Sequence, residues 1–87
     1  MQERRRIHRT RVFKAAKLFG HARTTDCVVQ DISVLGARLV MVSTAAIPGT
    51  FDLSFDSART LRACRVVWRS PMEIGIQFED GTFRSAA

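Results

Sequence analysis

The 87-residue chain contains 14 lysine and arginine residues against 8 aspartate and glutamate residues, which gives a formal net charge of +6. Residues 1–20 carry this whole excess, because they hold seven basic residues and a single acid, whereas the charges of residues 21–87 cancel. The hydrophobic fraction of 46% excludes a disordered chain, and no run approaches the ~20 apolar residues that span a bilayer. We expect one small cytoplasmic domain with a local anion-binding segment at its N-terminus, rather than a uniformly basic nucleic-acid coat.

From residue 27 onward, apolar side chains recur at every second position, which is the period of half-buried β-strands. The alternation is clearest in residues 51–56, where phenylalanine and leucine alternate with aspartate and serine. Residues 12–19 suit a strand or a helix equally well. The pattern predicts strands near residues 27–32, 36–43, 50–56, 61–69 and 73–79.

Short turn signals separate these segments. Pro48 and Gly49 precede one strand, residues 56–59 separate two strands at hairpin length, and Ser70-Pro71 interrupts the chain after another. Five or six short strands at this spacing favour an all-β fold, either a small antiparallel barrel or a sandwich.

The cysteines and histidines give no sign of a metal or redox site. Cys27 and Cys64 lack the close spacing of a zinc knuckle or a redox pair, so we expect both to pack as small apolar residues in or near the core. Ser33 could pair only with His8 or His21, and no nucleophile elbow accompanies it. We therefore expect no metal and no catalytic residues, and the chain is not expected to be an enzyme.

The first informative motif is Arg5-x-x-x-Arg9, which follows Glu3 and Arg4 in the basic segment. Arginine presents a rigid, permanently charged fork of donors that fits phosphate oxygens or the O6/N7 edge of guanine. Several arginines on one flexible segment are suited to close around a compact, doubly charged ligand. The alternative interpretation is a solvated basic tail.

The second motif is Asp31-x-Ser33-x-x-Gly36, between two expected strands. In an extended segment, Asp31 and Ser33 would point to the same face, where a carboxylate and a hydroxyl can bind the donors of a guanine. Gly36 permits a backbone conformation or a close approach that a side chain would block. The alternative is an ordinary polar turn. Arg38, two residues later, is either an extra ligand contact or a surface charge.

Taken together, the two motifs on a small all-β frame resemble the PilZ domain, a bacterial receptor module for cyclic di-GMP. The resemblance runs from Glu3 to about Phe78 and includes the two late expected strands. It implies a six-stranded antiparallel β-barrel in which residues 12–19 form the first strand, with little or no C-terminal helix. The expected organisation is a flexible ligand-gripping segment, a barrel and a short tail, in residues 1–11, 12–80 and 81–87.

The resemblance also implies a set of ligand-binding residues. In the family, the arginines of the first motif grip the phosphates and the guanine edges of the ligand. The aspartate and serine of the second motif contact guanine and the ligand backbone, and its glycine shapes the turn. On this sequence, the set is Arg4, Arg5, Arg9, Asp31, Ser33 and Gly36, with Arg38 as an added contact. Trp68 is expected in the core or at a barrel end, with a stacking platform for guanine as the alternative.

The function implied by the resemblance is that of a non-catalytic cyclic di-GMP receptor that signals when the ligand orders the N-terminal segment. We expect no cofactor besides this ligand, no DNA partner and no membrane insertion, and we expect a downstream protein that acts in a process such as motility or biofilm formation. The number of bound ligand molecules is left open. The alternative is a small basic barrel that binds single-stranded nucleic acid.

Overall fold

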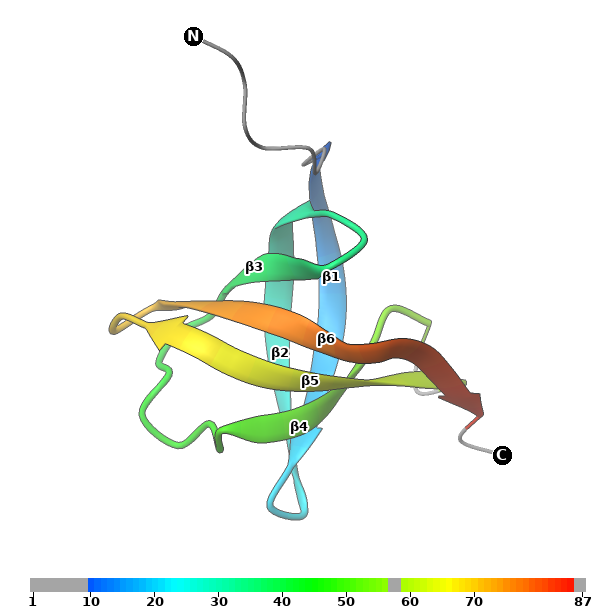
Figure 1. Ribbon diagram of the computed structural model, residues 1–87. Helices are drawn as coiled ribbons and strands as arrows, with labels where there is room; N and C mark the ends of the chain where they lie inside the picture. The colour runs from blue at the N-terminus through cyan, green and yellow to red at the C-terminus, as the bar shows by residue number, and fades with distance from the viewer. Residues whose placement is uncertain (1–9, 57–58, 86–87) are drawn as a thin grey trace, which may run out of the picture.

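The protein forms a closed six-stranded β-barrel (Figure 1). The computed structural model describes the backbone of residues 10–56 and 59–85, and the side chains of this part up to residue 79. The strands are β1 (Thr10–Gly20), β2 (Arg23–Ile32), β3 (Gly36–Val40), β4 (Thr50–Ser54), β5 (Thr60–Arg69) and β6 (Glu73–Ser85). They pair antiparallel in the order β1-β2-β3-β6-β5-β4, and β4 returns to β1. The all-β fold and the six-stranded barrel are confirmed, and residues 12–19 lie in a strand.

Two strands extend beyond the limits expected from the sequence. β2 begins at Arg23 because a two-residue turn joins it directly to β1, with Gly20 opposite Arg23. The two turn residues, His21 and Ala22, have φ angles of 53° and 57°, as a type I′ hairpin turn requires. β6 continues to Ser85 because its last residues pair with residues 60–62 of β5, so the strand enters the segment that was expected to be a tail.

The core fills the inside of the barrel with apolar side chains from all six strands. Leu39, Leu53 and Ile74 are completely buried, and each such burial stabilises the fold by roughly 1.5–3 kcal/mol. Cys27 and Cys64 belong to this core, as expected, and both are free thiols. Burial raises the pKa of Cys27 to about 11 and that of Cys64 to about 12. Both thiols therefore stay protonated at neutral pH.

Shifts in register interrupt the alternation of inward and outward side chains. One shift lies between Val29 and Asp31 on β2, and another lies between Val66 and Trp68 on β5. At each shift, one strand has an extra residue that has no partner on the neighbouring strand. Beyond this residue, side chains that would have pointed into the barrel point outward, and the reverse. The expectation that Trp68 lies in the core or caps the barrel is therefore wrong, since its side chain is 44% exposed on the outside.

The connection between β3 and β4 is tied to the turn between β5 and β6. Thr44 is buried, and its hydroxyl donates to the carbonyl of Ser70 at 2.5 Å. The amide of Met41 donates to the carbonyl of Met72 at 2.9 Å. These bonds hold the two connections side by side.

No helix in the described residues is long and apolar enough to cross a membrane.

Candidate functional site

A row of residues crosses the outer face of five neighbouring strands. Register pairing places Arg11 beside Asp31, Asp31 beside Arg38, Arg38 beside Gly75, and Gly75 beside Trp68. In the next row along the strands, Ala37 and Ile76 pack against the core. Because successive side chains of a strand point to opposite faces, the five residues point outward. We call these five residues the cross-strand row.

Asp31 and Arg38 form an ion pair within this row. Nη2 of Arg38 donates to Oδ2 of Asp31 at 2.9 Å, and the side chains are 33% and 8% exposed for Arg38 and Asp31. A carboxylate this well buried needs a charged or hydrogen-bonding partner, which Arg38 supplies. The Nε of Arg38 is also buried and has no hydrogen-bond partner within the described part of the chain. Arg38 is therefore not a freely solvated surface charge.

Ser33 lies in the turn between β2 and β3 rather than on a strand. β2 ends at Ile32, so the expectation that Ser33 shares a strand face with Asp31 is wrong. The Oγ of Ser33 accepts from the amides of Leu35 and Gly36 at 3.2 and 3.3 Å, while its own amide donates to the carbonyl of Gly36 at 2.8 Å. The hydroxyl thus fixes a tight turn next to Asp31.

Gly36 is required by a close approach of two backbones. A Cβ atom at this position would lie 2.0 Å from the carbonyl oxygen of Ile76 on β6, a distance that no side chain can adopt. Of the two reasons considered for this glycine, close approach is the one that the structure supports. Just before it, the carbonyl of Leu35 accepts from the amide of Phe78 at 2.7 Å, which continues the pairing of this turn with β6.

Gly75 is a member of the row that was not expected in the site, and Trp68 was expected there only as the alternative to a place in the core. A Cβ on Gly75 would lie 2.0 Å from Nε1 of Trp68, so the indole rests directly against this glycine. Gly75 stands between two buried isoleucines in a strand, and a glycine at such a position marks a close approach. The glycine in the strand pattern could have indicated a close approach from the sequence alone. That Trp68 is the residue that approaches it follows only from the pairing of β5 with β6.

The second motif and the start of β1 lie at the same end of the barrel (Figure 1). Thr10, the first residue of β1, is the register partner of Ile32, which directly precedes Ser33. Arg4, Arg5 and Arg9 lie outside the described residues. The structure therefore brings together four of the seven expected ligand-binding residues, namely Asp31, Ser33, Gly36 and Arg38.

The pairing of Ser33 with a histidine finds no support among the described residues. His21 occupies the turn at the other end of the β1–β2 ladder, roughly 30 Å along the strands from Ser33. His8 lies outside the described residues. Residues 10–56 and 59–79 contain no group of three histidine, cysteine, aspartate or glutamate side chains placed to hold a metal ion.

Comparison with protein families adds a decisive observation. The family model for the PilZ domain matches residues 3–86, which is essentially the whole chain. The protein belongs to the PilZ domain family. PilZ domains are non-catalytic domains that bind cyclic di-GMP, and the resemblance noted from the sequence is confirmed at the level of the family. A search of curated proteins found no match to this PilZ domain.

Proposed function

We propose that this PilZ domain is a receptor for cyclic di-GMP and that it binds the ligand on the cross-strand row. The observation that carries the proposal is the position of Asp31 on the outer face of the barrel. It lies beside the Ser33–Gly36 turn and at the end where the described chain begins. A carboxylate there is suited to accept the N1–H and N2–H donors of a guanine.

The distribution of charge supports a role of the N-terminal segment in binding the phosphates of the ligand. On the described barrel, Lys17, Arg38 and Arg65 each form an ion pair with an acid. The net positive charge of the chain lies in residues 1–20, so the field that attracts a dianionic ligand is strongest at this end of the sequence. We assign the gripping contacts to Arg5 and Arg9, whose forks bind phosphate oxygens bidentately, with Arg4 as a further contact.

Trp68 offers a stacking surface at the far end of the same row. Its indole is partly exposed and lies in the row that contains Asp31 and Arg38. Stacking of a base on an aromatic side chain contributes about 1–3 kcal/mol in proteins that bind single-stranded nucleic acids. We assign a guanine-stacking role to Trp68, which was the alternative considered for it in the sequence.

Signalling follows from ordering of residues 3–9, which precede β1, over the barrel when the ligand is bound. Closure of the segment changes the surface that the protein offers to a downstream partner. Hydrogen exchange of the backbone amides tests this step. We expect protection of residues 3–9 to rise with cyclic di-GMP, and equal protection with and without the ligand would exclude this ordering step.

The experiment that tests the receptor function is a titration with cyclic di-GMP followed by the fluorescence of Trp68, the only tryptophan in the chain. We expect Arg5→Ala and Arg9→Ala to lose roughly 2–5 kcal/mol of binding free energy while circular dichroism shows an intact barrel. Arg23→Ala is the matched control, because Arg23 is exposed at the opposite end of the β1–β2 ladder. Tighter, strongly salt-dependent binding of random single-stranded oligonucleotides would favour the nucleic-acid alternative instead.

A further inference from the structure

An apolar groove lies on the outside of the barrel, where a small domain normally presents polar side chains. Its volume is about 790 Å³. Ala15, Val28 and Val40 are register partners on β1, β2 and β3 and form its floor. We call it the apolar groove, and its lining includes the following apolar residues: Ala15, Val28, Val40, Val42, Phe55 and Met72.

The sequence of β3 and the residues after it fits a sheet that is covered on both faces. Leu39 and Met41 are buried in the core, whereas Val40 lines the groove and Val42 is 92% exposed. A strand with one solvated face alternates apolar and polar residues, but this segment is apolar on both sides. An exposed apolar surface of this kind marks an interaction site.

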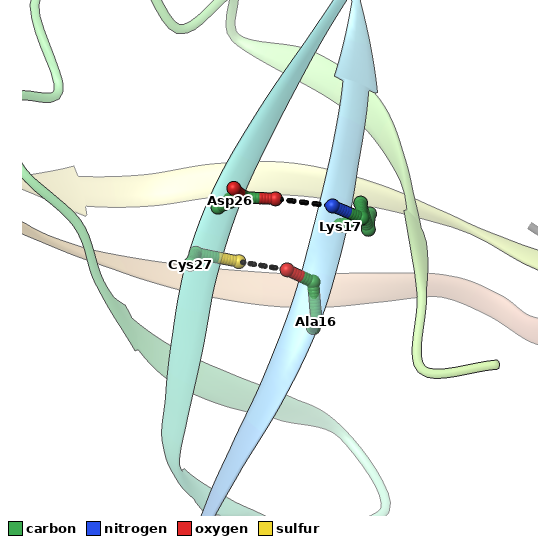
Figure 2. A network of polar contacts seen from close by, with 4 residues as sticks. All are labelled: Ala16, Lys17, Asp26 and Cys27. Carbon is green, nitrogen blue, oxygen red and sulfur yellow. Dashed lines mark hydrogen bonds and ion pairs between the residues drawn. The ribbon is translucent and has the colours of Figure 1, made fainter. Parts of the chain in front are cut away.

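A pair of opposite charges borders the groove (Figure 2). Nζ of Lys17 on β1 lies 2.5 Å from Oδ1 of Asp26 on β2. The two side chains are 48% and 81% exposed, so the pair adds little to the stability of the single chain. In the neighbouring pair of residues, the thiol of Cys27 donates to the carbonyl of Ala16 at 3.7 Å. Lys17 and Asp26 are the charged residues in the lining of the groove.

We propose that a second copy of this chain covers the apolar groove in a two-fold symmetric dimer. The two copies are complementary about an axis that lies in the interface, parallel to the strands and between β1 and β2. Such an axis exchanges β1 with β2, so Lys17 of one copy faces the second copy's Asp26, and Ala15 faces the second copy's Val28.

The same axis also matches the outer parts of the groove. The strand order around it is β4-β1-β2-β3, so the axis exchanges β4 with β3. Phe55 follows β4 and lies beside β1, where the ammonium of Lys14 is 5.9 Å from the centre of its ring. Phe55 is partly buried against its own core, and in the dimer its exposed part faces Val40 and Val42 of the other copy. Opposite charges and apolar side chains therefore both meet their complements across this axis.

Sedimentation of the full chain without ligand, over a wide range of concentration, tests the dimer. We expect the wild type to dimerise and Val28→Asp to be monomeric. Val67→Asp is the matched control, because Val67 is also an exposed valine on a strand but does not line the groove, and it should dimerise like the wild type. A wild type that stays monomeric at every concentration overturns the proposal. This test contains no dinucleotide, so its failure leaves the receptor function intact.

Charge reversal tests the position of the axis and does not depend on how Val28→Asp folds. Lys17→Asp and Asp26→Lys should each weaken dimerisation roughly tenfold, because each homodimer then brings like charges together. An equimolar mixture of the two variants should dimerise as the wild type does, since one copy then presents two acids to two lysines. If the mixture stays as weak as the separate variants, the proposed axis is wrong.

Discussion

The guanidinium of Arg38 on β3 donates to the carboxylate of Asp31 on β2 at 2.9 Å, across the outer face of the barrel. The central carboxylate of the proposed site is thus already held by a cation before the ligand binds. A guanine that approaches Asp31 meets a preoriented acceptor, and it must share this acceptor with Arg38. Two residues that were separate candidates in the sequence therefore act as one unit.

Loss of Arg38 should destabilise the barrel. Arg38→Ala leaves the buried carboxylate of Asp31 without this partner, and we expect the free energy of unfolding to fall by about 1–3 kcal/mol in urea denaturation. Arg65→Ala is the control, because the Arg65–Glu79 pair is exposed and 3.6 Å long, and its loss should change stability by less than about 1 kcal/mol. Equal effects of the two substitutions would contradict the structural role given to Arg38.

Gly36 and Gly75, which both face close neighbours, should respond differently to alanine. In Gly36→Ala, the new Cβ meets the backbone of β6, which cannot move aside, so we expect a loss of stability of about 2 kcal/mol or more. In Gly75→Ala, the neighbour is the indole of Trp68, which can rotate away. Thermal unfolding should show a smaller loss for Gly75→Ala, and its tryptophan emission should shift to the red. An unchanged emission would show that Trp68 does not rest on Gly75.

The turn between β1 and β2 should accept a stabilising substitution. His21 and Ala22 both have positive φ angles, a conformation that is unfavourable for residues with a Cβ and favourable for Asn-Gly in a type I′ turn. Replacing the pair by Asn-Gly should raise the free energy of unfolding by about 1 kcal/mol. The change lies far from the cross-strand row, so affinity for cyclic di-GMP should not change. A lower melting temperature in this variant would contradict the turn geometry.

The buried thiols predict a loss of stability at alkaline pH. The folded-state pKa values of about 11 for Cys27 and about 12 for Cys64 lie above the ordinary value of 9.0. The unfolded chain therefore releases these protons first as the pH rises. Stability contributed by the neutral thiols is complete below pH ~9 and falls above it, with a slope of at most about 1.4 kcal/mol per pH unit for each thiol.

Urea denaturation at a series of pH values from neutral to alkaline measures this slope. In the Cys27→Ala/Cys64→Ala double variant, the protein should be less stable at every pH, because cavities remain, but the slope that the thiols cause should disappear. A double variant that keeps the full alkaline slope would show that other groups cause it.

The hydrophobic pattern was sufficient to predict the strands and most of the core. Period-two alternation identifies inward residues such as Leu53 and Ile76 directly, because burial on one face of a strand imposes that period. The pattern could not predict the register shifts near Gln30 and Val67, since an extra residue in one strand depends on its pairing with another strand. For this reason Trp68 was assigned to the wrong side of the barrel.

The candidate site was predictable as a set of motifs but not as a geometry. The Asp31–Arg38 ion pair and the contact of Trp68 with Gly75 join residues of different strands, and they follow only from the closed sheet. The extension of β6 to Ser85 was missed because residues 80–85 show no alternation, and their pairing with β5 holds them in the sheet. The assignments of Arg4, Arg5 and Arg9 stay predictions.

The central claim is that cyclic di-GMP binds to the cross-strand row and is closed in by the N-terminal arginines. Calorimetric titration of the full chain with cyclic di-GMP at low salt tests this claim most directly. We predict saturable binding to the wild type, with heat that is lost in Arg9→Ala and in Asp31→Asn while circular dichroism shows both variants to be folded. A folded wild-type protein that releases no heat and shows no saturation with cyclic di-GMP would contradict the claim.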